Sequence, residues 1–382
     1  MTDSTAIAVD AIRAIYDLWR VDEDRVQWEG DPSPDGLLRQ GYGFDWWPGR
    51  FKIEVRASGP HPEIDYPIYR ISVRTDLLCD VDVTTPRFKQ SLCGFNHGAS
   101  TFALCAFPTT LPKALEKYGP LADFGVDLKS SIVWLSSTAY VHEGSKDWLP
   151  PVFAMFATLQ FAHAQFLVDV LAKSLGGRAD HTAPPGRTLP TSVAGILQIL
   201  KSDILPAARR PSRWIGTGEL EEIVVRWHNT DFERSLAFEG AVAVETSFGQ
   251  EAAIIMVRTD SQNAVLGNGL DVYLKLPHLD TREAIHALSI EMNFLEDRAW
   301  SKPGMPFIGG WSAEEWGGPG GPGFGPMFSW FIPNAFYQHG LAEILVTDAI
   351  ARAAMFRKML LPGAVDAPME EIQRRLHRRE AR

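Results

Sequence analysis

Three short motifs contain residue types that could support catalysis. The glycine-rich run Gly317–Gly325 lacks the Lys and the hydroxyl residue of a phosphate-binding loop, and its prolines remove backbone N–H donors. His142-Glu143 has no second histidine four residues later, as a zinc-protease helix requires. Cys93 and His97 could share a helix face, but two ligands are too few for a zinc site. We therefore expect a flexible glycine-rich loop, no catalytic residues, no metal and no cofactor.

Aromatic residues crowd the segment Pro306–Phe336, where proline and glycine allow the backbone to approach another molecule closely. Large aromatic faces of this kind suit protein or peptide recognition, although they can equally pack a core. For three of these side chains both alternatives stay open: Trp311, Trp316 and Phe324. Trp330 and Phe336 are expected to pack between a strand and the last helix.

Trp46 and Trp47 raise the same question in the first half of the chain. Adjacent strand residues point to opposite faces of a sheet, so the two indoles cannot both enter one core. One of them is expected under a loop, between the halves or on a partner surface. With the three aromatic residues above, they form our set of candidate partner-binding residues.

Composition limits the class of protein. The 382 residues are 45% hydrophobic and 22% charged, which predicts a globular chain of more than one core. The formal net charge of −10 disfavours a general role on nucleic acid or on an anionic membrane. Three cysteines and an N-terminus without a basic, then apolar, leader favour a soluble protein of the cytoplasm.

The domain boundary is predicted from the run 176–190, which is rich in glycine and proline and follows a long apolar helix at 151–171. That helix contains polar residues and is read as buried, not as a membrane span. We expect a first lobe over 1–178, a second lobe over 188–363 and a charged tail over 364–382. The tail is expected to be a solvated helix end.

Periodicity predicts the same order of elements in each lobe, α-β-β-β-α-β-β-α. In the first lobe, helices are expected at 4–20, 84–107 and 151–171, and strands at 43–47, 51–57, 68–76, 123–127 and 131–141. In the second lobe, helices are expected at 192–208, 280–300 and 341–360, and strands at 235–239, 242–247, 253–260, 307–312 and 327–336. The fold class is therefore α+β, with two antiparallel sheets of about five strands, each covered by helices on one face.

Two short matches suggest that the lobes arose by duplication. Val73–Asp76 and Val257–Asp260 both read Val-Arg-Thr-Asp at the end of the third predicted strand. Trp134 and Trp330 are each followed, at the same spacing, by alanine and an aromatic residue. We expect two similar lobes related by a pseudo-twofold axis.

The element order resembles the type III secretion chaperone-like superfamily, which includes YbjN-like proteins. A late asparagine in the central helix supports the resemblance, as Asn96 in Cys93–Asn96 and as Asn293 in Glu291–Phe294. The resemblance implies an antiparallel sheet covered by helices in each half. It also implies a bacterial binding module without chemistry of its own, in which a tandem copy replaces a dimer.

The function expected from these observations is non-enzymatic binding of another protein or peptide, by a chaperone-like, adaptor or regulatory protein. Its oligomeric state stays open, and a monomer with an internal pseudo-dimer is one alternative. Its acidic charge would select basic partners. Neither nucleic acid nor membrane is an expected partner. Two alternatives stay open: an enzyme whose site is assembled from scattered residues between the lobes, and a structural subunit of a larger complex.

Overall fold

The computed structural model describes most of both predicted lobes. The described residues are 4–48, 52–61, 67–77, 79–80, 85–99, 102–106, 133–175, 178–179, 198, 202, 205–227, 233–249, 251–263, 266–277, 282–298, 308–318 and 321–361. Several predictions lie outside these ranges, namely the strand at 123–127, most of the helix at 192–208, nearly all of the linker and the tail at 364–382.

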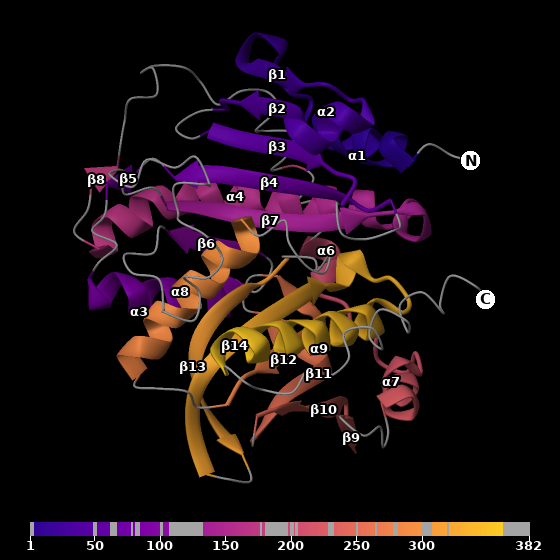
Figure 1. The fold of residues 1–382 in the computed structure, drawn as a ribbon, viewed down its shortest axis with the longest axis vertical. Helices are drawn as coiled ribbons and strands as arrows, with labels where there is room; N and C mark the ends of the chain where they lie inside the picture. The colour runs from indigo at the N-terminus through magenta and orange to yellow at the C-terminus, as the bar shows by residue number, and fades with distance from the viewer. Residues whose placement is uncertain are drawn as a thin grey trace.

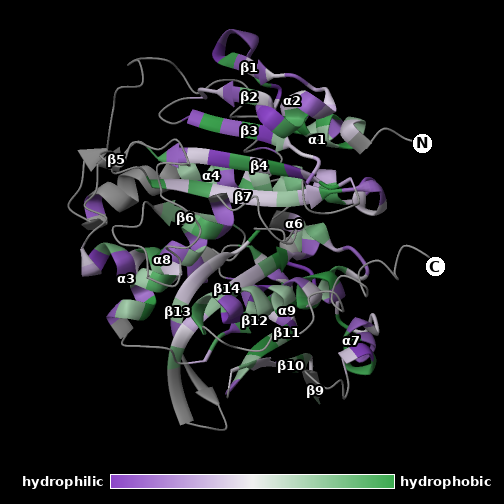
Figure 2. Ribbon diagram, in the orientation of Figure 1, coloured by the Kyte–Doolittle hydropathy of each residue, from purple (hydrophilic) through white to green (hydrophobic). Residues whose placement is uncertain are grey.

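The first lobe is built on one antiparallel sheet of six strands, in the order β1-β2-β3-β4-β7-β6. The strands are β1 (Val26–Gly30), β2 (Tyr42–Trp46), β3 (Lys52–Ser58), β4 (Tyr69–Leu77), β6 (Ala103–Ala106) and β7 (Val133–Val141). Apolar and polar residues alternate along β3 and β4, as the banding in Figure 2 shows. This alternation gives the sheet one apolar and one polar face.

The helices α1 (Ser4–Trp19) and α4 (Leu149–Leu175) cover the apolar face. Trp19 Nε1 donates to Thr158 Oγ1 at 3.0 Å, which joins the two helices. Gln160 of α4 donates through its amide nitrogen to the Thr75 hydroxyl at 3.1 Å. The short elements of this lobe are η1 (Glu23–Arg25), α2 (Pro34–Arg39), η4 (Glu143–Ser145) and the strand pair β5 (Cys79–Asp80) with β8 (Arg178–Ala179).

The second lobe has a sheet with the same order, β9-β10-β11-β12-β14-β13. Its strands are β9 (Glu233–Phe238), β10 (Ala241–Phe248), β11 (Glu251–Asn263), β12 (Gly267–Lys275), β13 (Gly310–Gly318) and β14 (Gly321–Pro333). Its helices are α6 (Leu205–Ala208), α7 (Glu219–Trp227), α8 (Arg282–Arg298), η6 (Asn334–Phe336) and α9 (Leu341–Leu360). The α+β fold with two similar lobes is thus confirmed, with six strands in each sheet (Figure 1).

The two lobes meet through their central helices, α3 (Pro86–Ala99) and α8 (Arg282–Arg298). Each helix packs on the edge strand of the other lobe, α3 on β13 and α8 on β6. Such a reciprocal exchange is the pattern of an isologous interface. Asn96 and Asn293 both donate to the Trp311 carbonyl, at 3.3 and 2.8 Å. A Cβ on Gly310 would lie 3.2 Å from the Asn96 side chain, so this close approach suits glycine.

Neither sequence match that suggested duplication joins equivalent positions. Val73–Asp76 lies on β4, whereas Val257–Asp260 lies on β11, which corresponds to β3. Trp134 points away from α4, to the polar face of its sheet, because it pairs with Asp76 and the Arg74 guanidinium lies 4.5 Å from its ring centroid. Trp330, in contrast, lies beneath Arg352 of α9. The repeat is therefore established by topology and not by these residues.

Three further predictions are corrected. The helix predicted to 107 ends at Ala99, and Ala103–Ala106 is strand β6, so Cys93 and Cys105 do not share a helix. Gly267–Lys275, where no strand was predicted, is the strand β12. Gly317–Gly325 is not a flexible loop, because β13 and β14 pair as far as Gly318 with Gly321. No helix in the described ranges is long and apolar enough to cross a membrane.

Candidate functional site

The candidate aromatic residues occupy very different environments. Trp46 and Trp311 are fully buried, so neither can contact a partner, and both belong to the core. Trp311 packs against Phe356 of α9 with ring centroids 4.9 Å apart. Phe324 is half-buried beside His286. The side chain of Trp316 lies outside the described set, although its backbone pairs with Gly323.

Trp47 remains a surface residue, as the opposite orientation of adjacent strand residues predicts. Its side chain is 41% exposed, and Lys52 Nζ lies 5.8 Å from its ring centroid. Trp330 and Phe336, which were expected in the core, are buried.

A second exposed tryptophan, Trp28, was not among the sequence candidates. It lies on edge strand β1 and is also 41% exposed. Its ring stacks on Tyr42, with ring centroids 5.6 Å apart, and its centroid lies 5.1 Å from that of Tyr16 and 5.2 Å from that of Phe44. A single tryptophan in the short polar run Val26–Gly30 was the available signal, but five residues are too few to identify a strand by the alternation of apolar and polar residues. Trp28 therefore presents a large apolar surface on an aromatic support.

The backbone of β1 is also accessible. Its residues pair with β2 in an unbroken register from Val26 with Trp46 to Gly30 with Tyr42, and no strand in the described part of the chain pairs with its other side. Trp47 N donates to Arg25 O at 3.2 Å. This bond identifies Arg25 and Trp47 as a hydrogen-bonded pair, and such pairs occur at every second residue of an antiparallel ladder. The backbone N–H and C=O groups of Val26 and Trp28 therefore point away from β2.

Gly30 terminates this strand. Its φ is +82°, and a Cβ there would lie 1.7 Å from the Gly41 carbonyl oxygen, so only glycine fits. The edge strand thus offers about five residues, enough for a short added strand.

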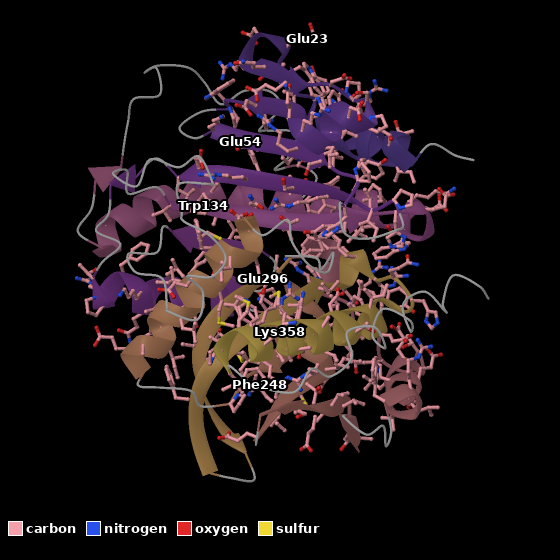
Figure 3. All side chains as sticks on the ribbon, in the orientation of Figure 1. Glu23, Glu54, Trp134, Phe248, Glu296 and Lys358 are labelled. Atoms are coloured by element: carbon pink, nitrogen blue, oxygen red, sulfur yellow. The ribbon has the colours of Figure 1, made fainter. Side chains whose placement is uncertain are left out.

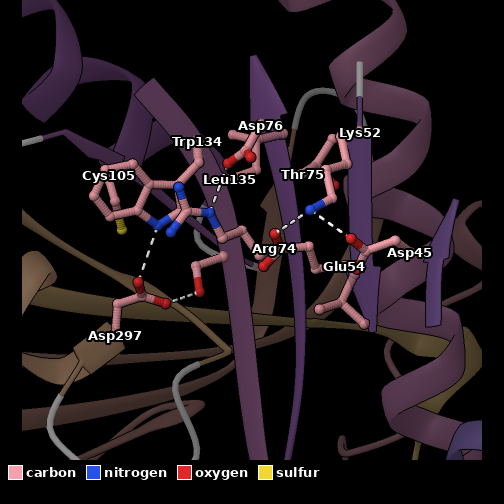
Figure 4. Close-up of polar contacts among 12 residues, drawn as sticks. Asp45, Lys52, Glu54, Arg74, Thr75, Asp76, Cys105, Trp134, Leu135 and Asp297 are labelled. Atoms are coloured by element: carbon pink, nitrogen blue, oxygen red, sulfur yellow. Dashed lines mark hydrogen bonds and ion pairs between the residues drawn. The ribbon is translucent and has the colours of Figure 1, made fainter. Parts of the chain in front are cut away.

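The polar face of the first sheet carries a network of opposite charges, which we call the charged face: Lys52, Glu54 and Arg56 of β3, Arg70, Arg74 and Asp76 of β4, and Asp45 of β2 (Figure 4). Lys52 Nζ lies 2.5 Å from Asp45 Oδ2 and 2.7 Å from Glu54 Oε1. Arg56 pairs with Asp45 and with Glu29 of β1. The network therefore links β1 to the centre of the sheet.

Arg74 connects this network to the second lobe. Its Nε lies 2.6 Å from Asp76 Oδ1, and its guanidinium lies 4.5 Å from the ring centroid of Trp134. Trp134 Nε1 donates at 3.0 Å to Asp297 Oδ2, from the last turn of α8. Ser136 also donates to Asp297. Asp297 thus fixes α8 on the charged face (Figure 4).

Burial and pairing act differently on two of these carboxyls. Burial alone would raise the pKa of Glu54, but Lys52, with Arg74 and Arg56, holds it below its ordinary value. Burial raises the pKa of Asp76, and the pairing with Arg74 only partly opposes this effect. Most of the charges of this face have charged partners within it, and Arg70 donates to Thr138 Oγ1 at 3.3 Å and to the Asp297 carbonyl. We therefore assign the face a structural role, in contrast to the exposed edge.

Other buried ionisable groups lie on separate elements. Burial raises the pKa of Glu291 on α8 to about 8, that of Asp348 on α9 to about 7 and that of Asp271 on β12 to about 6. Asp271 accepts a hydrogen bond from Tyr273 on the same strand. Within the described ranges, no group of three or more His, Cys, Asp or Glu side chains could hold a metal ion.

No family model, curated protein or solved structure matches this chain.

Proposed function

We propose that this chain is a non-enzymatic protein that binds another polypeptide by adding an extended segment of it to strand β1. The observation that carries the proposal is Trp28, which is exposed on an aromatic support at a sheet edge where four of the five residues are exposed and backbone donors and acceptors point outward. Main-chain hydrogen bonds at a sheet edge provide affinity, and alternate side chains provide specificity. Trp47, which directly follows β2, would extend the contact.

The two lobes differ at this edge. In the second lobe, α7 packs against the edge strand β9 and its neighbour β10. In the first lobe, α1 lies over β3 and β4, and four of the five β1 residues are exposed. Proteins usually protect a strand edge with charged residues, Pro or a bulge, and β1 has one charged residue, Glu29, and no Lys, Pro or bulge. Cys93 and Cys105 are buried and form no disulfide, which supports a reducing compartment, and we place the protein in the cytoplasm.

The experiment is a selection of random displayed peptides on the full chain, followed by affinity measurement on variants. Val26→Pro removes a backbone N–H that points away from β2, whereas Val26→Thr keeps it and serves as the matched control. We expect Val26→Pro to weaken the selected peptides at least about tenfold, and Trp28→Ala to cost about 2 kcal/mol of binding free energy. Val26→Thr should bind like the wild type.

A second readout separates edge binding from loss of folding. Hydrogen exchange of the Trp28 amide should slow when a peptide binds to the wild-type chain. Selection of no peptide, or of peptides that bind Val26→Pro as well as the wild type, would refute the proposal.

A further inference from the structure

The surroundings of β1 carry a strong excess of negative charge. Between residues 17 and 35 there are seven acidic and two basic residues, a net charge of 2 − 7 = −5, which is half of the −10 of the whole chain. The acidic residues are Asp17, Asp22, Glu23, Asp24, Glu29, Asp31 and Asp35, and the basic residues are Arg20 and Arg25. All of them lie in the described structure, immediately around the exposed edge.

This charge reaches the aromatic support of Trp28. Burial raises the pKa of the Tyr16 hydroxyl, and the charges of Glu23 and Asp17 raise it further, so both carboxylates act at the ring that Trp28 contacts. Figure 3 places Glu23 at the end of the molecule where β1 lies. A cationic segment that approaches this edge would be attracted over the distance that salt leaves unscreened.

The faces of β1 add a spacing requirement. Trp28 lies on the side of the sheet covered by α1, in contact with Phe44. Gln27 and Glu29 point to the other side, where Glu29 is 47% exposed and pairs with Arg56. A strand added beside β1 would therefore alternate between an apolar environment and an acidic one.

We propose that the segment bound at β1 is basic and amphipathic, with apolar residues alternating with Lys or Arg. This inference rests on the proposed function and specifies the chemistry of the partner. The apolar side chains contact Trp28, and the basic ones face Glu29 on the other side of the sheet.

The test uses three synthetic peptides of about nine residues, a length that spans the edge strand with a margin. The first alternates Arg or Lys with Val or Phe, the second has the same composition in scrambled order, and the third carries Glu in place of each basic residue. Affinity for the full chain is measured at about 50 mM and about 300 mM salt. We expect the first peptide to bind at least about tenfold more tightly than either of the others at low salt, and its advantage over the acidic peptide to shrink at high salt.

Charge variants locate the effect on the molecule. Glu23→Lys with Glu29→Lys should weaken the basic peptide about tenfold. The matched control, Glu222→Lys with Glu251→Lys, makes the same change of net charge at exposed positions of the second lobe and should have little effect. Equal weakening by both pairs, equal binding of the three peptides or no binding of the basic one would overturn the inference.

These outcomes are separable from those of the displayed-peptide selection. If selected peptides depend on Val26 but are acidic or neutral, edge binding stands and the basic partner falls. If no selected peptide depends on Val26, both fall.

Discussion

The last helix of each lobe, α4 in the first and α9 in the second, buries a polar side chain at the same position, but the two side chains have different partners. Gln160 and Arg352 are each the twelfth residue of their helix, since 160 − 149 and 352 − 341 both give 11. Gln160 is neutral and donates to Val73 O, Leu135 O and the Thr75 hydroxyl. Arg352 is fully buried and forms bidentate hydrogen bonds to Glu296 of α8. One lobe thus holds its helix by hydrogen bonds to its sheet, and the other by an ion pair to the interface helix.

The faces opposite these helices also differ. The charged face of the first sheet has Lys52, Glu54 and Arg56 along β3. On β11, the corresponding strand of the second sheet, the same face has Ala252, Ile254 and Met256, all half-buried. The same topology therefore accommodates a paired charge network along this strand in one copy and apolar residues at the corresponding positions in the other. The comparison implies that the backbone plan, and not any particular side chain, is what the two lobes share.

The largest effect is expected from breaking the ion pair of the second lobe. Glu296→Gln leaves Arg352 buried without its carboxylate, and we expect a loss of about 4 kcal/mol in the free energy of unfolding. Gln160→Leu, its counterpart in the first lobe, should cost about 2 kcal/mol, because it strands only neutral hydrogen-bonding groups. Both values come from denaturant unfolding curves.

The double variant Glu296→Gln with Arg352→Met tests the cause of that loss. Arg352 lies over the rings of Phe328 and Trp330, at 4.0 and 5.0 Å, so methionine fits the same apolar surroundings. The double variant should recover much of the stability. Equal losses in the two lobes, or no recovery, would contradict the contrast drawn between them.

A somewhat smaller effect is expected at Glu291 of the interface helix α8, whose charge is partly balanced by Lys89 of α3. Glu291 is buried, and its raised pKa of about 8 reflects this burial, which Lys89 only partly offsets. The folded state then binds more protons than the unfolded state between pH 4.5 and about 8, so stability falls as pH rises through this window. Glu291→Gln removes this dependence, and should match the wild type near pH 4.5 and exceed it by about 3 kcal/mol at pH 7.

Unfolding curves measured across the pH range provide the test. Glu283→Gln, an exposed change on the same helix, is the control and should keep the wild-type profile. If the free energy of unfolding of Glu291→Gln changed with pH as that of the wild type does, Glu291 would not be the source of the pH dependence.

Much of the fold could be predicted because alternation along β3 and β4 and helical spacing in α4 and α9 are long, strong patterns. The strand β6 could not, since four apolar residues that directly follow a helix have no period that distinguishes them from its continuation. The strand β12 was not predicted, although Leu270, Val272 and Leu274 have the period of a half-buried strand.

The candidate site was harder to predict than the fold. Sequence composition drew attention to Trp311, whose indole is in fact enclosed by Phe328 and Phe356. Trp28 was not selected as a candidate, because its exposure depends on which strands lie beside β1. The order of strands in a sheet is set by contacts between distant parts of the chain. The charge excess around β1 was visible, but its meaning required the edge to be located first.

The smallest expected effect compares the charged face of the first sheet with the corresponding face of the second sheet. Glu54→Gln weakens the pairing with Lys52 but leaves Asp45 and Asp76 to neutralise their neighbours, so we expect a loss of about 1 kcal/mol at low salt. Because part of this network is exposed to solvent, about 1 M NaCl should reduce the loss substantially. Ile254→Ala on the second sheet removes apolar contact instead, and its cost of about 1 kcal/mol should not fall with salt. Denaturant curves at the two salt concentrations give both values, and a salt response shared by the two variants would mean that the faces are held by the same kind of interaction.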